Sequence, residues 1–410
     1  MKINNLTDIE SFHNIFEEDS NKRDIKSYIL KDCQFTKSKV FYPDVVLYSH
    51  KTKKAYNPIN EIILSLDKVS VIKKNNFEIN EINFLEESPM FYFIYNTENY
   101  YHFIYDSLPY LITYNEIKKT VPNIKLLMNY PNKETKNIYN FVFEFLELLN
   151  IKKEDITFVS DETIYRVVFI SSSYTHGDDS NLPPRKEVYD FFTKLVESNF
   201  DKFNSNTPKK IYISRRSWIH NDYTNIGTNY TLKRKMENEN ELVGMLENHG
   251  YKEIFTEKLN TIEKLNLFYN AENIIGAIGG GLCNVLFSKP KTKLITIVSP
   301  TFLEVNNRFK YSLDCVNNEY FYETKHTEST DFKTNMRVQH NDKNLIGEIS
   351  KINGDILTII YSDDMIAGWN NEVKYKKIEV ESKSCTKLDY GLNSPFNVDL
   401  KKIKDLIFLG

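Results

Sequence analysis

Residues 209–300 alternate short β-rich runs with amphipathic helical segments, and this alternation limits the possible folds more than any other feature of the chain. Strands separated by helices of about ten residues favour a parallel sheet with right-handed crossovers. The apolar spacing predicts strands at 209–216, 251–256, 273–277 and 293–298, and helices at 239–249, 261–271 and 279–287. Gly250 is the expected C-cap of the first of these helices.

Charged residues and glycines stand at the expected carboxyl ends of these strands. Arg215 and Arg216 end the first run, Glu257 follows the second, and Gly279, Gly280 and Gly281 follow the third. Ligands of such sheets bind beyond the carboxyl ends of the strands. Glycines before a helix also let a phosphate approach backbone N–H groups that a Cβ would block. Because the spacing is not G-x-G-x-x-G, a different Rossmann-type enzyme, for example an oxidoreductase, is the less favoured alternative.

The amino-terminal half predicts a second α/β layer. Before residue 85 only short runs such as 45–48 and 61–64 suggest peripheral strands. Further along, we expect strands at 90–95, 124–128, 156–159 and 163–171, and helices at 98–118, 133–149 and 185–199.

Two other features set the expected domain boundaries. The polar segment 204–208 ends in a proline, as linkers often do, and residues 344–360 resemble two strands joined by an Asn-Gly turn. Trp369 and Tyr361 in this region could form a carbohydrate platform, although packing is the commoner role. We therefore divide the chain into an acceptor-binding α/β domain at 1–205, a donor-binding Rossmann-like domain at 206–330, a small β insertion at 331–385 and a closing helix at 386–410.

Composition excludes several functional classes. The chain has 53 basic and 56 acidic residues and a net charge of -3, which argues against an electrostatic nucleic-acid binder. Neither a long apolar window nor the apolar core of a signal peptide is present, so we expect a cytoplasmic protein without a transmembrane segment. The four cysteines have no C-x-x-C spacing, which predicts neither a zinc site nor a disulfide framework.

His102 and Asp106 are the strongest candidates for acid–base chemistry. They are four residues apart in a predicted helix, so both side chains project from one face. A carboxylate beside an imidazole orients the ring and raises its basicity, and either group could take a proton from a sugar hydroxyl. A structural hydrogen-bonded pair is the alternative. Pro109 predicts either a kink or a helix that stops near Ser107 and restarts.

Several segments together resemble glycosyltransferase family 61. Residues 99–109 match its N-Y-Y-H-x-x-x-D-x-L-P signature, and the later segments follow in the family's order. These later segments are I-S-R at 213–215, R-x-x-x-N-E at 234–239, E-x-L at 257–259 with Glu263 and Leu267-Phe268 behind it, and G-x-H-G-A-G-L-x-N at 276–284. One departure is Ile278, which stands where the family has histidine.

The resemblance implies a two-domain GT-B fold and inverting transfer of a sugar from a nucleotide diphosphate donor to a glycan hydroxyl. Family members use UDP-xylose, UDP-N-acetylglucosamine or arabinose donors. Asp106 is then the first choice of base, with His102 behind it. Tyr101 and His176 are candidate acceptor contacts, although a structural role is commoner for a lone histidine such as His176. Ile278 removes a hydrogen-bond donor, so a catalytically inactive sugar- or nucleotide-binding relative is the alternative.

The residues at the strand ends are the candidates for binding the donor that the resemblance implies. Arg215 and Arg216 can offer forked donors to phosphate, and we favour Arg215 because neighbours on a strand face opposite ways and one should form an ion pair. Glu257 would reach the ribose or the sugar, with a structural salt bridge as its alternative role. Gly279, Gly280, Gly281, Leu282 and Asn284 complete the set, although Asn284 could anchor the loop instead. Asp178-Asp179 and Asp363-Asp364 lack D-x-D spacing, so no metal is required, and Mn²⁺ or Mg²⁺ is the alternative.

Overall fold

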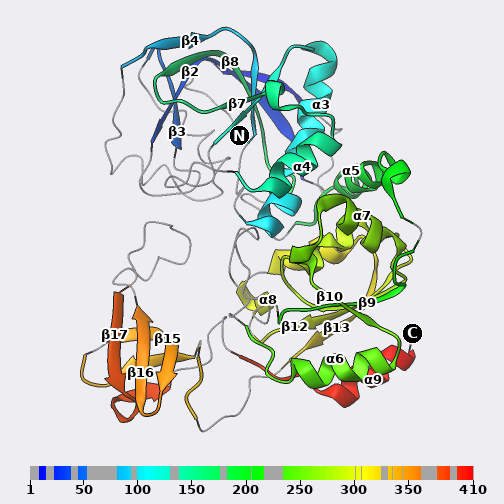
Figure 1. Ribbon diagram of the computed structural model, residues 1–410. Helices are drawn as coiled ribbons and strands as arrows, with labels where there is room; N and C mark the ends of the chain where they lie inside the picture. The colour runs from blue at the N-terminus through cyan, green and yellow to red at the C-terminus, as the bar shows by residue number, and fades with distance from the viewer. Residues whose placement is uncertain are drawn as a thin grey trace. The chain divides into compact units, whose positions relative to one another are not determined.

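The computed structural model describes residues 9–14, 23–37, 45–52, 81–93, 99–129, 138–175, 182–204, 206–216, 234–300, 302–305, 307–324, 331–334, 336–343, 345–361, 376–387 and 395–409. The chain divides into two compact units, Met1–Asn199 and Phe200–Gly410. Both units are mixed α/β structures, and the second also contains a separate antiparallel sheet (Figure 1).

The first unit is built on an eight-stranded mixed sheet. Four neighbouring strands are parallel and run in the order β8 (Thr163–Ser171), β5 (Met90–Phe93), β6 (Lys125–Met128) and β7 (Ile156–Phe158). Helix α3 (Tyr110–Thr120) connects β5 to β6, α4 (Asn140–Leu148) connects β6 to β7, and α5 (Lys186–Glu197) follows β8.

The rest of this sheet extends the predicted second α/β layer with strands that come mainly from the region before residue 85. The long strand β2 (Lys26–Lys37) pairs antiparallel with β8, and β1 (Ile9–Asn14) and β3 (Val45–Ser49) pair antiparallel with β2. Strand β4 (Phe84–Glu86) pairs parallel with β8. Strand β2 was not predicted because lysines interrupt its apolar pattern. Its side chains at Leu30 and Phe35 are nevertheless fully buried. The run at 61–64 lies outside the described residues.

The helix expected at 98–118 is interrupted. His102–Ser107 is a π-helical turn, and α3 begins only at Tyr110 with Pro109 as its N-cap. Since Pro109 has no N–H to donate, a continuous helix would lose a hydrogen bond there. The amide of Leu108 instead donates to the carbonyl of Phe103, five residues earlier, at 2.9 Å. The helix therefore stops at Ser107 and restarts, which is one of the two expected outcomes.

The second unit contains the predicted parallel sheet. Its five strands follow the order β10 (Lys252–Ile254), β9 (Lys210–Ile213), β11 (Asn273–Ala277), β12 (Lys293–Val298) and β13 (Asn317–Glu323), and every neighbouring pair is parallel. The predicted crossovers are α6 (Glu239–Asn248) and α7 (Thr261–Asn270). Gly250 ends α6 with a φ of 82°, a left-handed conformation that favours glycine.

The helix expected to follow the glycines is shorter than predicted and of another type. Leu282–Phe287 form a six-residue 3₁₀ helix, and all six side chains are buried. Cys283, Asn284 and Val285 are poor α-helix formers, so packing sets the turn here. Asn284 holds the turn through its Nδ2, which donates to the carbonyl of Gly281 at 2.8 Å. The dipole at this helix start is accordingly weaker than that of the expected α-helix.

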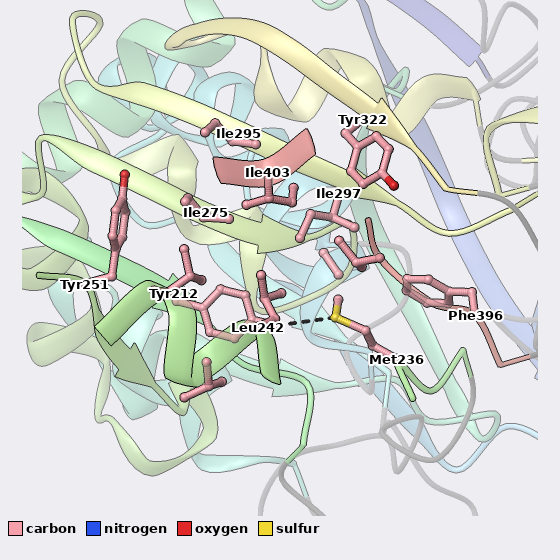
Figure 2. Close-up of a cluster of buried hydrophobic side chains, with 14 residues drawn as sticks. Tyr212, Met236, Leu242, Tyr251, Ile275, Ile295, Ile297, Tyr322, Phe396 and Ile403 are labelled. Atoms are coloured by element: carbon pink, nitrogen blue, oxygen red, sulfur yellow. Dashed lines mark hydrogen bonds between the residues drawn. The ribbon is translucent and has the colours of Figure 1, made fainter. Parts of the chain in front are cut away.

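A buried apolar cluster joins the sheet of the second unit to α6 and to the carboxyl-terminal helix α9 (Leu400–Leu409) (Figure 2). Asn238 fastens the segment before α9, because its side chain donates to the carbonyl of Val398 at 2.7 Å and accepts from the amide of the same residue at 3.0 Å. The cluster consists of Tyr212, Met236, Leu242, Val243, Leu246, Tyr251, Ile275, Ala277, Ile295, Ile297, Tyr322, Phe396, Val398 and Ile403.

The third sheet is antiparallel and has its own small core. Its order is β17 (Lys376–Glu381), β16 (Ile356–Tyr361), β15 (Leu345–Asn353), β14 (Arg337–His340) and β18 (Cys385–Lys387). The expected hairpin is present, since β15 pairs with β16 and Gly354 has a φ of 59°. Tyr361 ends β16, whereas Trp369 lies outside the described residues. In the part of the chain that the structure describes, no helix has the length and apolar character needed to cross a membrane.

Candidate active site

His102 and Asp106 are in direct contact in the π-helical turn of the first unit. Nδ1 of His102 and Oδ2 of Asp106 are 2.6 Å apart. His102 is 7% exposed and Asp106 is fully buried. An imidazole that donates from Nδ1 to a carboxylate carries its basic lone pair on Nε2, and the carboxylate stabilises the protonated ring. This geometry is that of a base with an orienting carboxylate.

A second group, Thr175, binds the other oxygen of Asp106. The hydroxyl of Thr175 lies 2.8 Å from Oδ1 of Asp106, and Thr175 is 2% exposed. Both oxygens of the buried carboxylate therefore accept hydrogen bonds, as a buried charge requires. Thr175 was not among the residues singled out in the sequence, where its only distinction is that it precedes His176. His176 itself lies outside the described residues.

Tyr101, a predicted acceptor contact, is buried among other rings. It is 3% exposed, and its ring meets that of His102 edge-on at 5.4 Å and that of Tyr105 at 5.6 Å. Aromatic contacts of this kind fix the orientation of a neighbouring ring. In this structure Tyr101 packs against the imidazole.

In the second unit, Arg215 lies against the glycine loop. A Cβ placed on Gly279 would be 2.7 Å from Nη1 of Arg215, and one placed on Gly281 would be 2.9 Å from Oγ1 of Thr256. The residues that follow β9, β10 and β11 thus converge at the carboxyl edge of the sheet. A guanidinium, a hydroxyl and backbone amides at one sheet edge are groups that bind phosphate.

Arg216 makes a different set of contacts from its neighbour. Its Nε and Nη2 each lie 2.6 Å from the carboxylate of Glu253, and Nη1 lies 2.7 Å from Oδ1 of Asn240. This forked ion pair occupies the guanidinium of Arg216. Of the two arginines, Arg215 is the one beside the glycines.

Glu239 is a buried carboxylate that anchors the start of the arginine loop. Its Oε1 accepts from the amide of Arg215 at 2.7 Å, from the hydroxyl of Tyr212 at 2.8 Å and from that of Ser214 at 3.3 Å. Burial raises the pKa of Glu239, an effect opposed by these bonds and by Arg215. Burial also lowers the pKa of Arg215, which the charge of Glu239 counteracts.

In the sequence, Glu239 is notable only as the last residue of the R-x-x-x-N-E segment, and no role was predicted for it. Its position as the first residue of α6 gave no sign that it reaches back to the end of β9. The preceding Asn238 of the same segment fastens the segment before α9, as described above. Both motif residues therefore hold the architecture around Arg215.

The remaining predicted donor contacts have varied surroundings. Glu257 is half-buried in a single 3₁₀ turn after β10. Leu282 is 1% exposed, with Cδ1 only 2.9 Å from a Cβ placed on Gly276, so it packs against strand β11. Ile278 is 3% exposed and its amide donates to the carbonyl of Ile297 at 2.9 Å, which extends the pairing of β11 with β12.

Among the described residues, no three His, Cys, Asp or Glu side chains are grouped as a metal site. Asp178-Asp179 and Asp363-Asp364 lie outside the part of the chain that the structure describes.

The raised pKa of Glu239 predicts a pH-dependent stability. A carboxyl whose folded pKa exceeds its ordinary value of 4.5 stabilises the fold fully below that value, and this stability is lost as pH rises through the raised pKa. Glu239→Gln cannot titrate. We therefore expect the free energy of unfolding of the variant, minus that of the wild type, to increase with pH above 4.5, by at most about 1.4 kcal/mol per pH unit.

Urea unfolding followed by far-ultraviolet circular dichroism measures this difference. The test is the slope of this difference against pH, because a hydrogen bond lost in the variant changes the difference by the same amount at every pH. A difference that stays constant or falls as pH rises would contradict a raised pKa for Glu239.

Comparison with known proteins identifies the class of the chain. Residues 100–295 match the family model of Glycosyltransferase 61, and this match includes His102, Asp106, Arg215 and the glycine loop. The enzyme class is therefore that of the glycosyltransferases, which act on a donor and an acceptor. The match confirms the predicted resemblance to glycosyltransferase family 61 over these residues. No curated protein matches it.

Proposed function

We propose that this protein is an inverting glycosyltransferase that moves a sugar from a UDP-sugar to a hydroxyl of a glycan or of a protein-linked glycan. The first unit would be the acceptor-binding domain and the second the donor-binding domain of a GT-B enzyme. The observation that carries this proposal is the packing of Arg215 against Gly279 at the carboxyl edge of a parallel sheet, within a family 61 region.

His102 is the proposed base, with Asp106 as the residue that orients it. This reverses the order suggested by the sequence, because both oxygens of the fully buried Asp106 already accept hydrogen bonds. In the proposed step, the acceptor oxygen attacks the anomeric carbon and its proton passes to Nε2 of His102. The bond from that carbon to the phosphate oxygen breaks on the opposite face, and the electron pair leaves with the nucleoside diphosphate.

Arg215 and the amides of the glycine loop are the proposed stabilisers of the departing diphosphate. Negative charge grows on the phosphate oxygens as the glycosidic bond breaks, and preorganised donors aimed at that charge lower the barrier. Such donors make a metal unnecessary, so we propose that transfer proceeds without Mn²⁺ or Mg²⁺. Trp369 and Tyr361, considered above as a carbohydrate platform, have no role in this proposal.

Titration calorimetry with UDP, GDP and CDP, each with Mn²⁺ and with EDTA, tests the proposal. We expect one nucleotide, UDP, to bind with micromolar affinity in both conditions. Absence of binding to all three would contradict a nucleotide-sugar donor. Binding of UDP without hydrolysis or transfer of any UDP-sugar would favour the inactive relative, with Ile278→His as the variant to restore the missing donor.

A further inference from the structure

We infer that Thr175 is a positioning residue that sets the orientation and proton affinity of His102 through Asp106. The inference rests on the proposed role of His102 as base. Neither the family motif at 99–109 nor the sequence spacing includes Thr175, which reaches Asp106 from the loop after β8.

The hydroxyl of Thr175 has a single proton and two acceptors within reach. Oδ1 of Asp106 lies at 2.8 Å and the carbonyl oxygen of Tyr105 at 3.1 Å. Hydrogen bonds to ionised acceptors are shorter and roughly twice as strong as neutral ones. The proton is therefore directed to the carboxylate, and the chain of contacts runs from Thr175 to Asp106 to Nδ1 of His102.

Buried arginines hold the loop that carries Thr175. Nη2 of Arg23 donates to the carbonyl of Leu182 at 2.9 Å and to that of Thr175 at 3.4 Å. Nη1 of Arg185 in turn donates to the carbonyl of Arg23 at 3.4 Å. Both arginines are 7% exposed. A side chain on a backbone braced in this way can hold a neighbouring carboxylate in one place.

Tyr110, Arg23 and Tyr101 are titratable groups near the pair. Burial raises the pKa of Tyr110, and the charge of Asp106 raises it further while Arg23 opposes it. Tyr101 contributes its ring edge to His102. Thr175 donates a hydrogen bond directly to the carboxylate.

Loss of this hydroxyl changes the proton affinity of the pair in a definite direction. With neutral His102 the pair carries a net negative charge, and with protonated His102 it is neutral. The Thr175 hydroxyl stabilises the negative charge and so favours the unprotonated pair. Without it, the pair holds its proton more tightly and its apparent pKa rises.

The test is Thr175→Val, which keeps the size and shape of the side chain. We expect kcat/KM for sugar transfer at pH 7 to fall about tenfold, and the acidic limb of its pH profile to move up by about one pH unit. Thr175→Ser restores the hydroxyl and should restore both. The matched control is Thr113→Val, which removes a buried hydroxyl bonded to Tyr174 and Ser171 and should leave the acidic limb in place.

A second readout does not depend on catalysis. NMR titration of labelled histidine rings, with the His102 signal assigned from His102→Gln, should show the same upward shift in Thr175→Val and none in Thr113→Val. An unchanged His102 titration and pH profile in Thr175→Val would overturn the inference, and so would an equal shift in the control. If the wild-type protein transfers no sugar while the His102 titration still shifts in Thr175→Val, the effect of Thr175 on the pair is supported and the proposed function is refuted.

Discussion

Replacement of His102 by glutamine is expected to lower kcat for sugar transfer by about 10² to 10⁴-fold, the usual contribution of a general base. Glutamine retains a polar side chain of similar length but takes no proton at neutral pH. Affinity for the nucleotide should not change, because the groups proposed to bind it belong to the second unit. Steady-state kinetics and calorimetry on the same preparation measure the two quantities.

The control for this variant is His249→Gln. His249 lies at the end of α6, where its Nδ1 is 2.8 Å from the carbonyl of Met245, and it should leave kcat unchanged. Asp106→Asn removes the carboxylate but leaves the imidazole, so its loss should not exceed that of His102→Gln. A nearly active His102→Gln beside an inactive Asp106→Asn would show that Asp106 is the base.

Arg215→Ala is expected to weaken UDP binding by about 10 to 100-fold, which corresponds to the loss of charge-assisted hydrogen bonds worth about 1.5–3 kcal/mol. The loss in kcat should be larger, about 10² to 10³-fold, because the leaving group gains charge in the transition state. Calorimetry with UDP and initial rates at saturating donor measure these effects.

The adjacent arginine provides a matched control. Arg216→Ala deletes the same side chain one residue away but breaks the fork with Glu253, so it should lower the thermal stability of the second unit and leave UDP affinity unchanged. Equal losses of UDP affinity in the two variants would contradict the assignment of the phosphate site to Arg215. A loss confined to Arg216→Ala would place the site on the other arginine.

The sheet of the second unit was predictable because its strands β9, β11 and β12 are buried on both faces. Such strands appear in a sequence as short continuous apolar runs, and the runs at 273–277 and 293–298 coincide with β11 and β12. The amino-terminal sheet was harder to predict. Its strand β2 mixes lysines with apolar residues, and its antiparallel pairing with β8 joins segments more than a hundred residues apart.

The candidate site was likewise predictable only in part. The rule that strand ends converge predicted that Arg215 and the glycines would lie near each other, and the helical spacing predicted the contact between His102 and Asp106. Thr175 is separated from Asp106 by 69 residues, and no periodicity connects the two. The π-helical turn depends on Pro109 and on the packing around it, which local propensity does not describe.

The anomeric configuration of the first product tests the central claim most directly. Wild-type protein is incubated with the UDP-sugar that it consumes and a hydroxyl acceptor, and proton NMR records the anomeric signal as it first appears. A single displacement assisted by His102 predicts a product whose anomeric configuration is opposite to that of the donor. A product with the donor's configuration would contradict the account, because retention requires a different mechanism from one base and one departing diphosphate.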